Sequence, residues 1–182
     1  MRRAVFALLC LWVLAALAGT GWFGLRVWQQ ARDNGAVRAL AAGRDVVPPA
    51  GADPRVAHAR ALYMAWRDRI PEAEALAPAL AGAPVTLRAE YHYAIGNARM
   101  RAGFEAIEAN RVDEATARIN LAKAAYREAL RMQPDDYDAK VNLDLAMRLV
   151  RDLPRDGQDG DEPETRPEQL WTDLPGLPRG AP

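Results

Sequence analysis

The 182-residue chain contains no serine, a single cysteine (Cys10) and only two histidines, His58 and His92. The absence of serine excludes serine nucleophiles, and one cysteine cannot form an internal disulfide. Neither histidine has a second histidine or cysteine at metal-ligand spacing, and no glycine-rich phosphate loop is present. We therefore expect a protein that is not an enzyme and that holds no metal or cofactor.

An excess of charge of one sign is also missing. The chain has 24 basic and 24 acidic residues, which give a formal net charge of zero. Such a balance provides no general attraction to nucleic acid or to an anionic lipid surface. We predict that nucleic acid is not a partner.

An uncharged apolar run occupies residues 4–25, AVFALLCLWVLAALAGTGWFGL. About 20 apolar residues span the hydrocarbon core of a bilayer as a helix. Trp22 and Trp28 fall near one boundary of this run, where tryptophan is enriched in membrane proteins. We interpret residues 1–26 as a single-pass transmembrane anchor in the cytoplasmic (inner) membrane.

A cleaved signal peptide is the competing interpretation of this run, because Ala16-Leu17-Ala18 has the small-x-small form of a cleavage site. The apolar run continues well past Ala18, which favours the anchor. Arg2 and Arg3 are typical of a cytoplasmic flank, so we expect the bulk of the chain on the other side of the membrane.

Residues 27–52 are predicted to form a juxtamembrane helix and a linker. The helix is expected to end at Asn34-Gly35, and proline and glycine dominate residues 43–54. Asp53-Pro54 predicts an N-cap and the first residue of a new helix. A short helix is expected from Pro71. One apolar face of the helix that starts at Pro54 is predicted to comprise Ala59, Leu62, Tyr63, Trp66 and Ile70.

Residues 86–153 predict three further helices, so the expected fold class is all-α. The second of these helices ends before Pro134, and its apolar seam comprises Val112, Ala115, Ile119, Ala122, Tyr126 and Ala129. The first contains Gly96, although glycine within a helix costs about 1 kcal/mol relative to alanine. Gly96 therefore predicts that another helix crosses too closely for a side chain.

These residues resemble the tetratricopeptide repeat, a helical hairpin of 34 residues. Ile95-Gly96 matches its Leu-Gly step, and Tyr126 and Pro134 match its aromatic and closing positions. The segment between Gly96 and Pro134 is longer than in the repeat. If residues 110–115 form the turn, both helices gain about two turns, which gives one elongated hairpin. A loop inserted after Gly103 is the weaker alternative. Residues 53–153 thus resemble a repeat domain.

The groove of such a domain is the expected partner-binding surface. In peptide-binding repeats, asparagines on the first helices bind the ligand, and motif alignment places Asn97 and Asn142 at those positions. An amide offers both a donor and an acceptor, which suits an extended peptide. The clamp of these repeats also has a basic residue, and Tyr93 occupies that position here. The missing basic side chain argues against a full carboxylate clamp. The predicted groove residues share an exposed face and are Tyr93, Asn97, Met100, Arg101 and Asn142. Solvent exposure, or capping of neighbouring turns, is the alternative.

A more specific resemblance comes from the combination of one N-terminal span, the elongated hairpin and the segments YHYAIGNARMRAG, AKAAYREALRMQPDDYDAKVNLDLAMRL and LPGLPRGAP. This combination resembles the MxaK family, which is encoded with methanol dehydrogenase genes in methylotrophic bacteria. The resemblance implies a periplasm-facing assembly factor for methanol dehydrogenase maturation, including calcium insertion. It also implies partners with von Willebrand factor A domains, and methanol dehydrogenase or its maturation factors.

The repeat core is also similar to the repeat proteins of Bat-type operons, which accompany MoxR ATPases and von Willebrand factor A proteins. The alternative function is therefore a structural subunit of a Bat- and MoxR-associated periplasmic complex unrelated to methanol oxidation.

Residues 154–182 contain six prolines, four glycines and a run of acidic residues, which predicts a disordered tail. Leu170, Trp171 and Leu174 form a candidate docking element in it, although an incidental exposed tryptophan is the alternative. The acidic stretch does not match a calcium-binding loop, because Gln158 and Gly160 occupy positions where oxygen ligands are needed. We interpret it as a solvated charge run.

Overall fold

The computed structural model describes residues 2–153. Its helices are α1 (Arg2–Ala41), α2 (Pro54–Trp66), α3 (Ile70–Glu74), the 3₁₀ helix η1 (Ala77–Leu80), α4 (Val85–Glu108), α5 (Val112–Met132) and α6 (Tyr137–Asp152). No strand occurs in the part of the chain that the structure describes, so the predicted all-α class is confirmed there. The predicted tail, with Leu170, Trp171 and Leu174, lies outside these residues.

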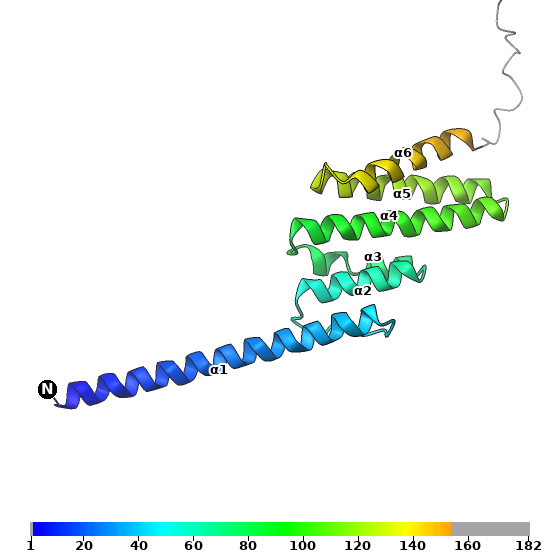
Figure 1. Cartoon of the computed structure of the whole chain (residues 1–182). Coiled ribbons are helices and arrows are strands. Elements are labelled where there is room, and N and C mark those ends of the chain that lie inside the picture. Colours follow the sequence, from blue (N-terminus) through cyan, green and yellow to red (C-terminus); the bar gives the residue numbers. More distant parts are fainter. Residues whose placement is uncertain (1, 154–182) are drawn as a thin grey trace, which may run out of the picture. The chain divides into compact units, whose positions relative to one another are not determined.

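α1 is one continuous helix whose N-terminal part extends away from the other helices (Figure 1). Its large apolar side chains are exposed: Trp12 is 76% exposed, Phe6 70% and Trp22 61%. Contiguous apolar surface of this kind marks a membrane or protein interaction site. Among the described residues this one helix, within Leu8–Ala41, is long and apolar enough to cross a membrane.

The C-terminal end of α1 belongs to the folded domain. The prediction that Asn34-Gly35 ends the helix is wrong, because α1 continues to Ala41. Ala39 and Leu40 are buried in the packing of α1 on α2. Burying a leucine side chain contributes about 1.5–3 kcal/mol, which outweighs the cost of about 1 kcal/mol for a helical glycine.

Residues 42–53, which connect α1 with α2, are fixed at both ends. The buried carboxylate of Asp33 in α1 accepts a hydrogen bond from the backbone N–H of Asp53, at 3.0 Å. Asp53 is the N-cap of α2 and Pro54 follows it, as predicted. Near the start of the connection, Asp45 makes ion pairs with Arg60 and Arg69. The predicted linker is thus tied to both helices that it joins.

α2 does not bury the face that the sequence pattern favoured. Leu62 is 36% exposed and Trp66 76% exposed. Asp68, with φ of 59°, follows the end of α2, and Ile70 belongs to α3 instead of α2. The residues that α2 buries are Val56, Ala57, His58, Ala61, Met64 and Ala65. Small alanines on this face allow close packing, so the larger apolar side chains remain at the surface.

α4 and α5 form the long helical hairpin that the sequence predicts. Residues 109–111 join them, with Asn110 at φ of 57°, so the turn is shorter than predicted. A Cβ atom on Gly96 would lie 2.5 Å from Cε1 of Tyr126, which confirms the predicted helix crossing. A second close approach was not predicted: a Cβ on Gly103 would lie 2.7 Å from Cγ1 of Ile119. Two glycines of α4 therefore allow α5 to pack closely.

The helices are stacked in chain order, from the end of α1 through α2, α4 and α5 to α6 (Figure 1). α2, α4 and α6 run in one direction, and α5 runs back between α4 and α6. The core lies mainly between α2, α3, η1 and α4, and α6 packs on α5. This arrangement leaves one face of α2, α4 and α6 available at the surface.

Candidate functional site

A groove with a volume of about 820 Å³ lies between the end of α1, α2 and α4. We call it the α2 groove. Its apolar lining comprises Val37 and Leu40 of α1, Leu62, Tyr63 and Trp66 of α2, and Leu87 of α4. Four of the five residues predicted to form one apolar face line this groove, namely Ala59, Leu62, Tyr63 and Trp66, whereas Ile70 is buried in the core.

A smaller hollow of about 270 Å³, which we call the α6 hollow, lies between α4, α5 and α6. Its lining residues are Asn97, Met100, Arg101, Phe104, Tyr126, Asn142 and Leu145. Asn97 and Arg101 also line the α2 groove. The two hollows therefore adjoin each other along α4, and together they form one surface from α1 to α6.

Three of the five predicted groove residues form a hydrogen-bonded cluster. Asn97 Oδ1 accepts hydrogen bonds from the Tyr126 hydroxyl (2.8 Å) and from Asn142 Nδ2 (3.1 Å). Asn142 Nδ2 also donates to the Tyr93 hydroxyl, at 3.1 Å. Burial raises the pKa of Tyr126 well above its ordinary value, so its hydroxyl remains a donor. The cluster connects α4, α5 and α6.

The cluster retains hydrogen-bonding capacity. Among residues 2–153, Asn97 Nδ2 and Asn142 Oδ1 make no side-chain hydrogen bond. One amide donor and one amide acceptor therefore remain at the α6 hollow, which is the pair that an extended backbone needs. The asparagines both bond their neighbours and keep groups for a ligand.

The other two predicted groove residues have mainly structural contacts. Met100 is only 5% exposed, so the prediction that it lies on an exposed face is wrong. Arg101 donates to the carbonyl oxygen of Ala65 at 2.6 Å, and it pairs with Asp68 at 3.2 Å. Its guanidinium also lies 5.3 Å from the ring centroid of Trp66. Arg101 thus caps the C-terminal end of α2 and holds Trp66 beside the α2 groove.

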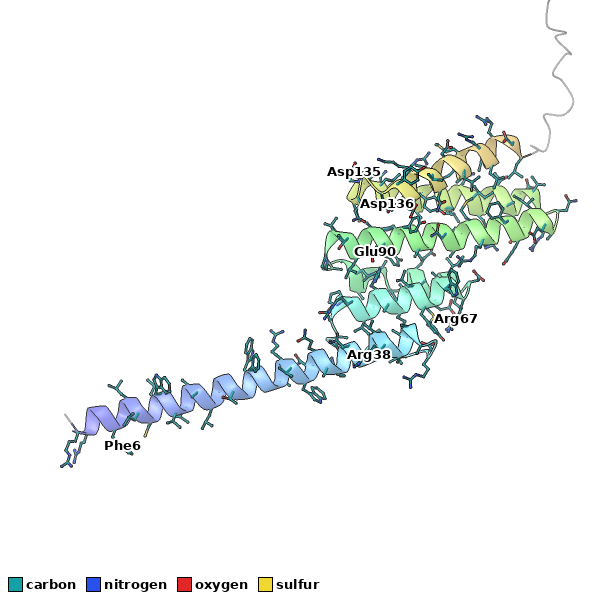
Figure 2. All side chains as sticks on the ribbon, in the orientation of Figure 1. Phe6, Arg38, Arg67, Glu90, Asp135 and Asp136 are labelled. Carbon is teal, nitrogen blue, oxygen red and sulfur yellow. The ribbon has the colours of Figure 1, made fainter. Side chains whose placement is uncertain are left out.

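Polar residues lie toward both ends of the α2 groove. Figure 2 shows Glu90 on α4 and Arg67 just after the end of α2. Arg67 lies over the ring of Tyr63, 3.8 Å from its centroid, and makes no ion pair within the described part of the chain. Near Glu90 lies His58, which is 7% exposed and has its Nε2 3.4 Å from Glu90 Oε2.

His58 favours its neutral form. Burial lowers the pKa of His58, and the Glu90 carboxylate partly offsets this effect. Its buried Nε2 has no hydrogen-bond partner in the described residues. The same residues contain no group of three or more histidine, cysteine or acidic side chains that could hold a metal ion. The arrangement is suited to binding an apolar segment with a few polar groups.

The sequence analysis did not identify Leu62, Tyr63 and Trp66 as binding residues. Their spacing along one apolar face of α2 was the available signal, and it was interpreted only as the amphipathic pattern of a helix. The adjacent Arg67, Asp68 and Arg69 indicate a solvent-facing helix end, and they could have placed Trp66 at the surface.

Comparison of the chain with protein-family models, with curated proteins and with solved structures gives no significant match. No relative therefore assigns a role to the α2 groove or to the α6 hollow.

Proposed function

We propose that this protein is a membrane-anchored interaction module that binds a segment of a partner protein across the α2 groove and the α6 hollow. The observation that carries this proposal is the α2 groove itself, which is large, open and lined mainly by apolar side chains. Such a site suits apolar side chains of a partner, while a few polar groups fix their orientation. The remaining amide groups of Asn97 and Asn142 would bond the partner's backbone.

The resemblance to the MxaK family gives this module a biological role. In this proposal the protein helps methanol dehydrogenase maturation, including calcium insertion, together with von Willebrand factor A-type partners. Gly96, Tyr126 and the long hairpin support it, because the repeat-like part of the resemblance depends on them. The proposed role is binding and assembly, without catalysis by this chain.

The same proposal places the protein in the inner membrane through residues 4–25, with its helical domain in the periplasm. The exposed apolar helix α1 supports the anchor. Orientation can be tested with Asp135→Cys in a Cys10→Ala background, because Asp135 is exposed. A membrane-impermeant maleimide should label this cysteine in intact spheroplasts. Labelling that requires lysis would show the opposite orientation.

The partner proposal is tested by cross-linked affinity purification of the full-length protein from detergent-solubilised membranes of cells grown on methanol. We expect mass spectrometry to identify a von Willebrand factor A protein together with methanol dehydrogenase or its maturation factors. Recovery of such a complex without any methanol dehydrogenase component would overturn the role in methanol oxidation. It would favour the structural subunit of a Bat- and MoxR-associated complex.

The site is tested in the same purification with Trp66→Ala and the control Tyr137→Ala. The two aromatic side chains are similarly exposed, at 76% and 74%, but Tyr137 does not line either hollow. Loss of an aromatic anchor worth about 1.4 kcal/mol would reduce partner recovery about tenfold for Trp66→Ala. Equal recovery by both variants would exclude the α2 groove as the binding site. Asn97→Ala is less informative, because it also removes the acceptor of buried Tyr126.

A further inference from the structure

We propose that the α2 groove also binds the protein's own C-terminal segment, with Trp171, Leu170 and Leu174 on its apolar lining. The segment would then compete with the partner for the groove. Docking itself does not depend on the partner, whereas this regulatory consequence rests on the proposed function.

The acidic excess of the chain lies in its C-terminal segment. Residues 154–182 contain seven acidic and three basic residues, whereas residues 1–153 contain 17 acidic and 21 basic residues. Arg2, Arg3 and Arg26 belong to the apolar run or its flanks, so residues 27–153 are nearly balanced, with 18 basic and 17 acidic residues. The acidic segment is therefore attracted only to individual exposed cations of the domain, and this attraction screens with salt.

The distribution of charge within the tail matches the groove. Glu168 and Asp173 flank Leu170-Trp171 in the sequence. Arg67 lies beside the apolar lining of the groove, is exposed, and makes no ion pair within residues 2–153. An acidic segment with a central tryptophan therefore has both an apolar site and a cation available. Trp66 and Leu62 provide the exposed apolar surface that a tryptophan ring would cover.

The length of the chain permits this contact. The tail leaves the folded domain at Asp152, the end of α6. The 24 residues of α4 span about 36 Å, and helices pack about 8–10 Å apart, so the groove lies within about 50 Å of Asp152. The chain from Asp152 to Trp171 reaches about 60 Å when extended. The segment can therefore reach the groove of its own chain.

Tethering makes even a weak contact effective. A short flexible tether gives an effective concentration in the millimolar range. A contact with a dissociation constant of about 1 mM between separate molecules would therefore be about half formed within one chain. A partner must then displace the tail, which would restrict binding to partners that bind the groove more tightly.

Docking can be tested by cysteine cross-linking in the full chain in detergent micelles, with Cys10→Ala as the background. Ala59→Cys places a thiol in the groove, and Thr172→Cys places one beside Trp171. A short bis-maleimide should close a loop within one chain. The control pair replaces Ala59→Cys with Asn120→Cys, an exposed α5 position that lines neither hollow.

We expect the intrachain product of the groove pair to exceed that of the control pair about tenfold, as an effective concentration raised by docking implies. Trp171→Ala and Arg67→Glu should each reduce it toward the control, and Arg67 is exposed, so its substitution leaves the core intact. Equal yields from the two pairs would overturn the proposal. Products only between two chains would also overturn it, since they would place the tail on a second copy.

The readout contains no partner protein, so its failure would leave the partner proposal intact. If docking occurs and the partner proposal is also correct, Trp171→Ala should increase partner recovery in the affinity purification. Unchanged recovery would show that docking does not control the groove.

Discussion

At the level of single residues, the packing of α4 on α5 depends on the missing side chain at Gly96. A Cβ at this position would lie 2.5 Å and 2.7 Å from two ring carbons of Tyr126. The ring cannot move aside easily, because it is 1% exposed and its hydroxyl is bonded to Asn97. We predict that Gly96→Ala lowers the free energy of unfolding by about 1–3 kcal/mol, despite the better helix propensity of alanine.

Gly35→Ala is the matched control for this substitution. Gly35 also lies within a helix, but a Cβ there would meet nothing within 4 Å. Without a steric cost, the substitution should raise stability by up to about 1 kcal/mol. Thermal unfolding of the helical circular dichroism signal in detergent would compare the two variants. Similar unfolding midpoints for both would contradict the close packing at Gly96.

His58 predicts a pH dependence of stability. Burial lowers the pKa of His58 in the folded chain below its ordinary value of 6.5, and burial acts in the same direction on His92. At pH values between the folded-state pKa of a histidine and its ordinary pKa, the unfolded chain therefore binds more protons than the folded chain does. Stability from the neutral imidazole is fully present above pH 6.5, and it is lost as the pH falls through the folded-state pKa.

We expect the thermal unfolding midpoint to decrease as the pH is lowered from about 7.5 to about 5. This pH range lies above the ordinary carboxylate pKa values. His58→Gln should make this dependence shallower, because it removes one titrating group and leaves His92. The double variant His58→Gln, His92→Gln should be nearly independent of pH in this range. An unchanged slope in His58→Gln would show that burial of this imidazole does not couple protonation to folding.

At the level of elements, Asp33 joins α1 to the rest of the domain. Its buried carboxylate accepts from the backbone N–H of Asp53 and from the Arg32 guanidinium. We predict that Asp33→Ala lowers the free energy of unfolding by about 1–3 kcal/mol, because the Asp53 N–H loses its acceptor. Limited proteolysis should also cut the connection at residues 42–53 faster.

Asp135→Ala serves as the control for the Asp33 variant. Asp135 is exposed, and Figure 2 shows it near the start of α6, on the far side of α4 from α1. Substitution there should change stability by no more than about 0.5 kcal/mol. If Asp33→Ala and Asp135→Ala are cleaved at the same rate, the hydrogen bond between α1 and α2 does not hold the connection.

The elements differ in how far the sequence determines them. Gly96 and Tyr126 are recognisable in the sequence itself. A glycine within one helix and an aromatic residue in the next are simply explained by a close crossing of the two helices. The end of α1 carries no such signal, because the burial of Leu40 depends on α2, which packs against it only after folding. Asn34-Gly35 is a local stop signal that tertiary packing overrides.

Of the two hollows of the candidate site, only the α6 hollow was predictable from the sequence. Asn97 and Asn142 were found by motif position, and the structure places them within hydrogen-bonding distance of each other. Trp66 was predicted only as part of one apolar face of this helix. Both faces of α2 are apolar, so periodicity could not show which of them is buried. The choice depends on Val56 and Met64, which are fully buried in the folded chain.

At the level of the whole molecule, α1 has two roles in one helix. Its N-terminal part exposes apolar side chains such as Trp12 and Leu17, whereas its C-terminal part buries Ala39 and Leu40 in the domain. Because a continuous helix joins the two parts, the α2 groove is connected to the exposed apolar part of α1 without a flexible linker. The helix rise of 1.5 Å per residue puts Val37 about 18 Å beyond the end of the apolar run.

This double role predicts opposite results for two N-terminal truncations. Removal of residues 2–25 should release the chain from membranes. The truncated protein should unfold in aqueous buffer at a midpoint similar to that of the full chain, because it retains Asp33 and Leu40, which contact the rest of the domain. Removal of residues 2–41 should lower the free energy of unfolding by about 2–5 kcal/mol. It deletes the buried side chain of Leu40, and it removes the Asp33 carboxylate that accepts from the backbone N–H of Asp53. Circular dichroism and chemical denaturation of both proteins would measure the difference. Equal stability of the two truncations would show that residues 26–41 do not pack against the domain. In that case α1 would not line the α2 groove.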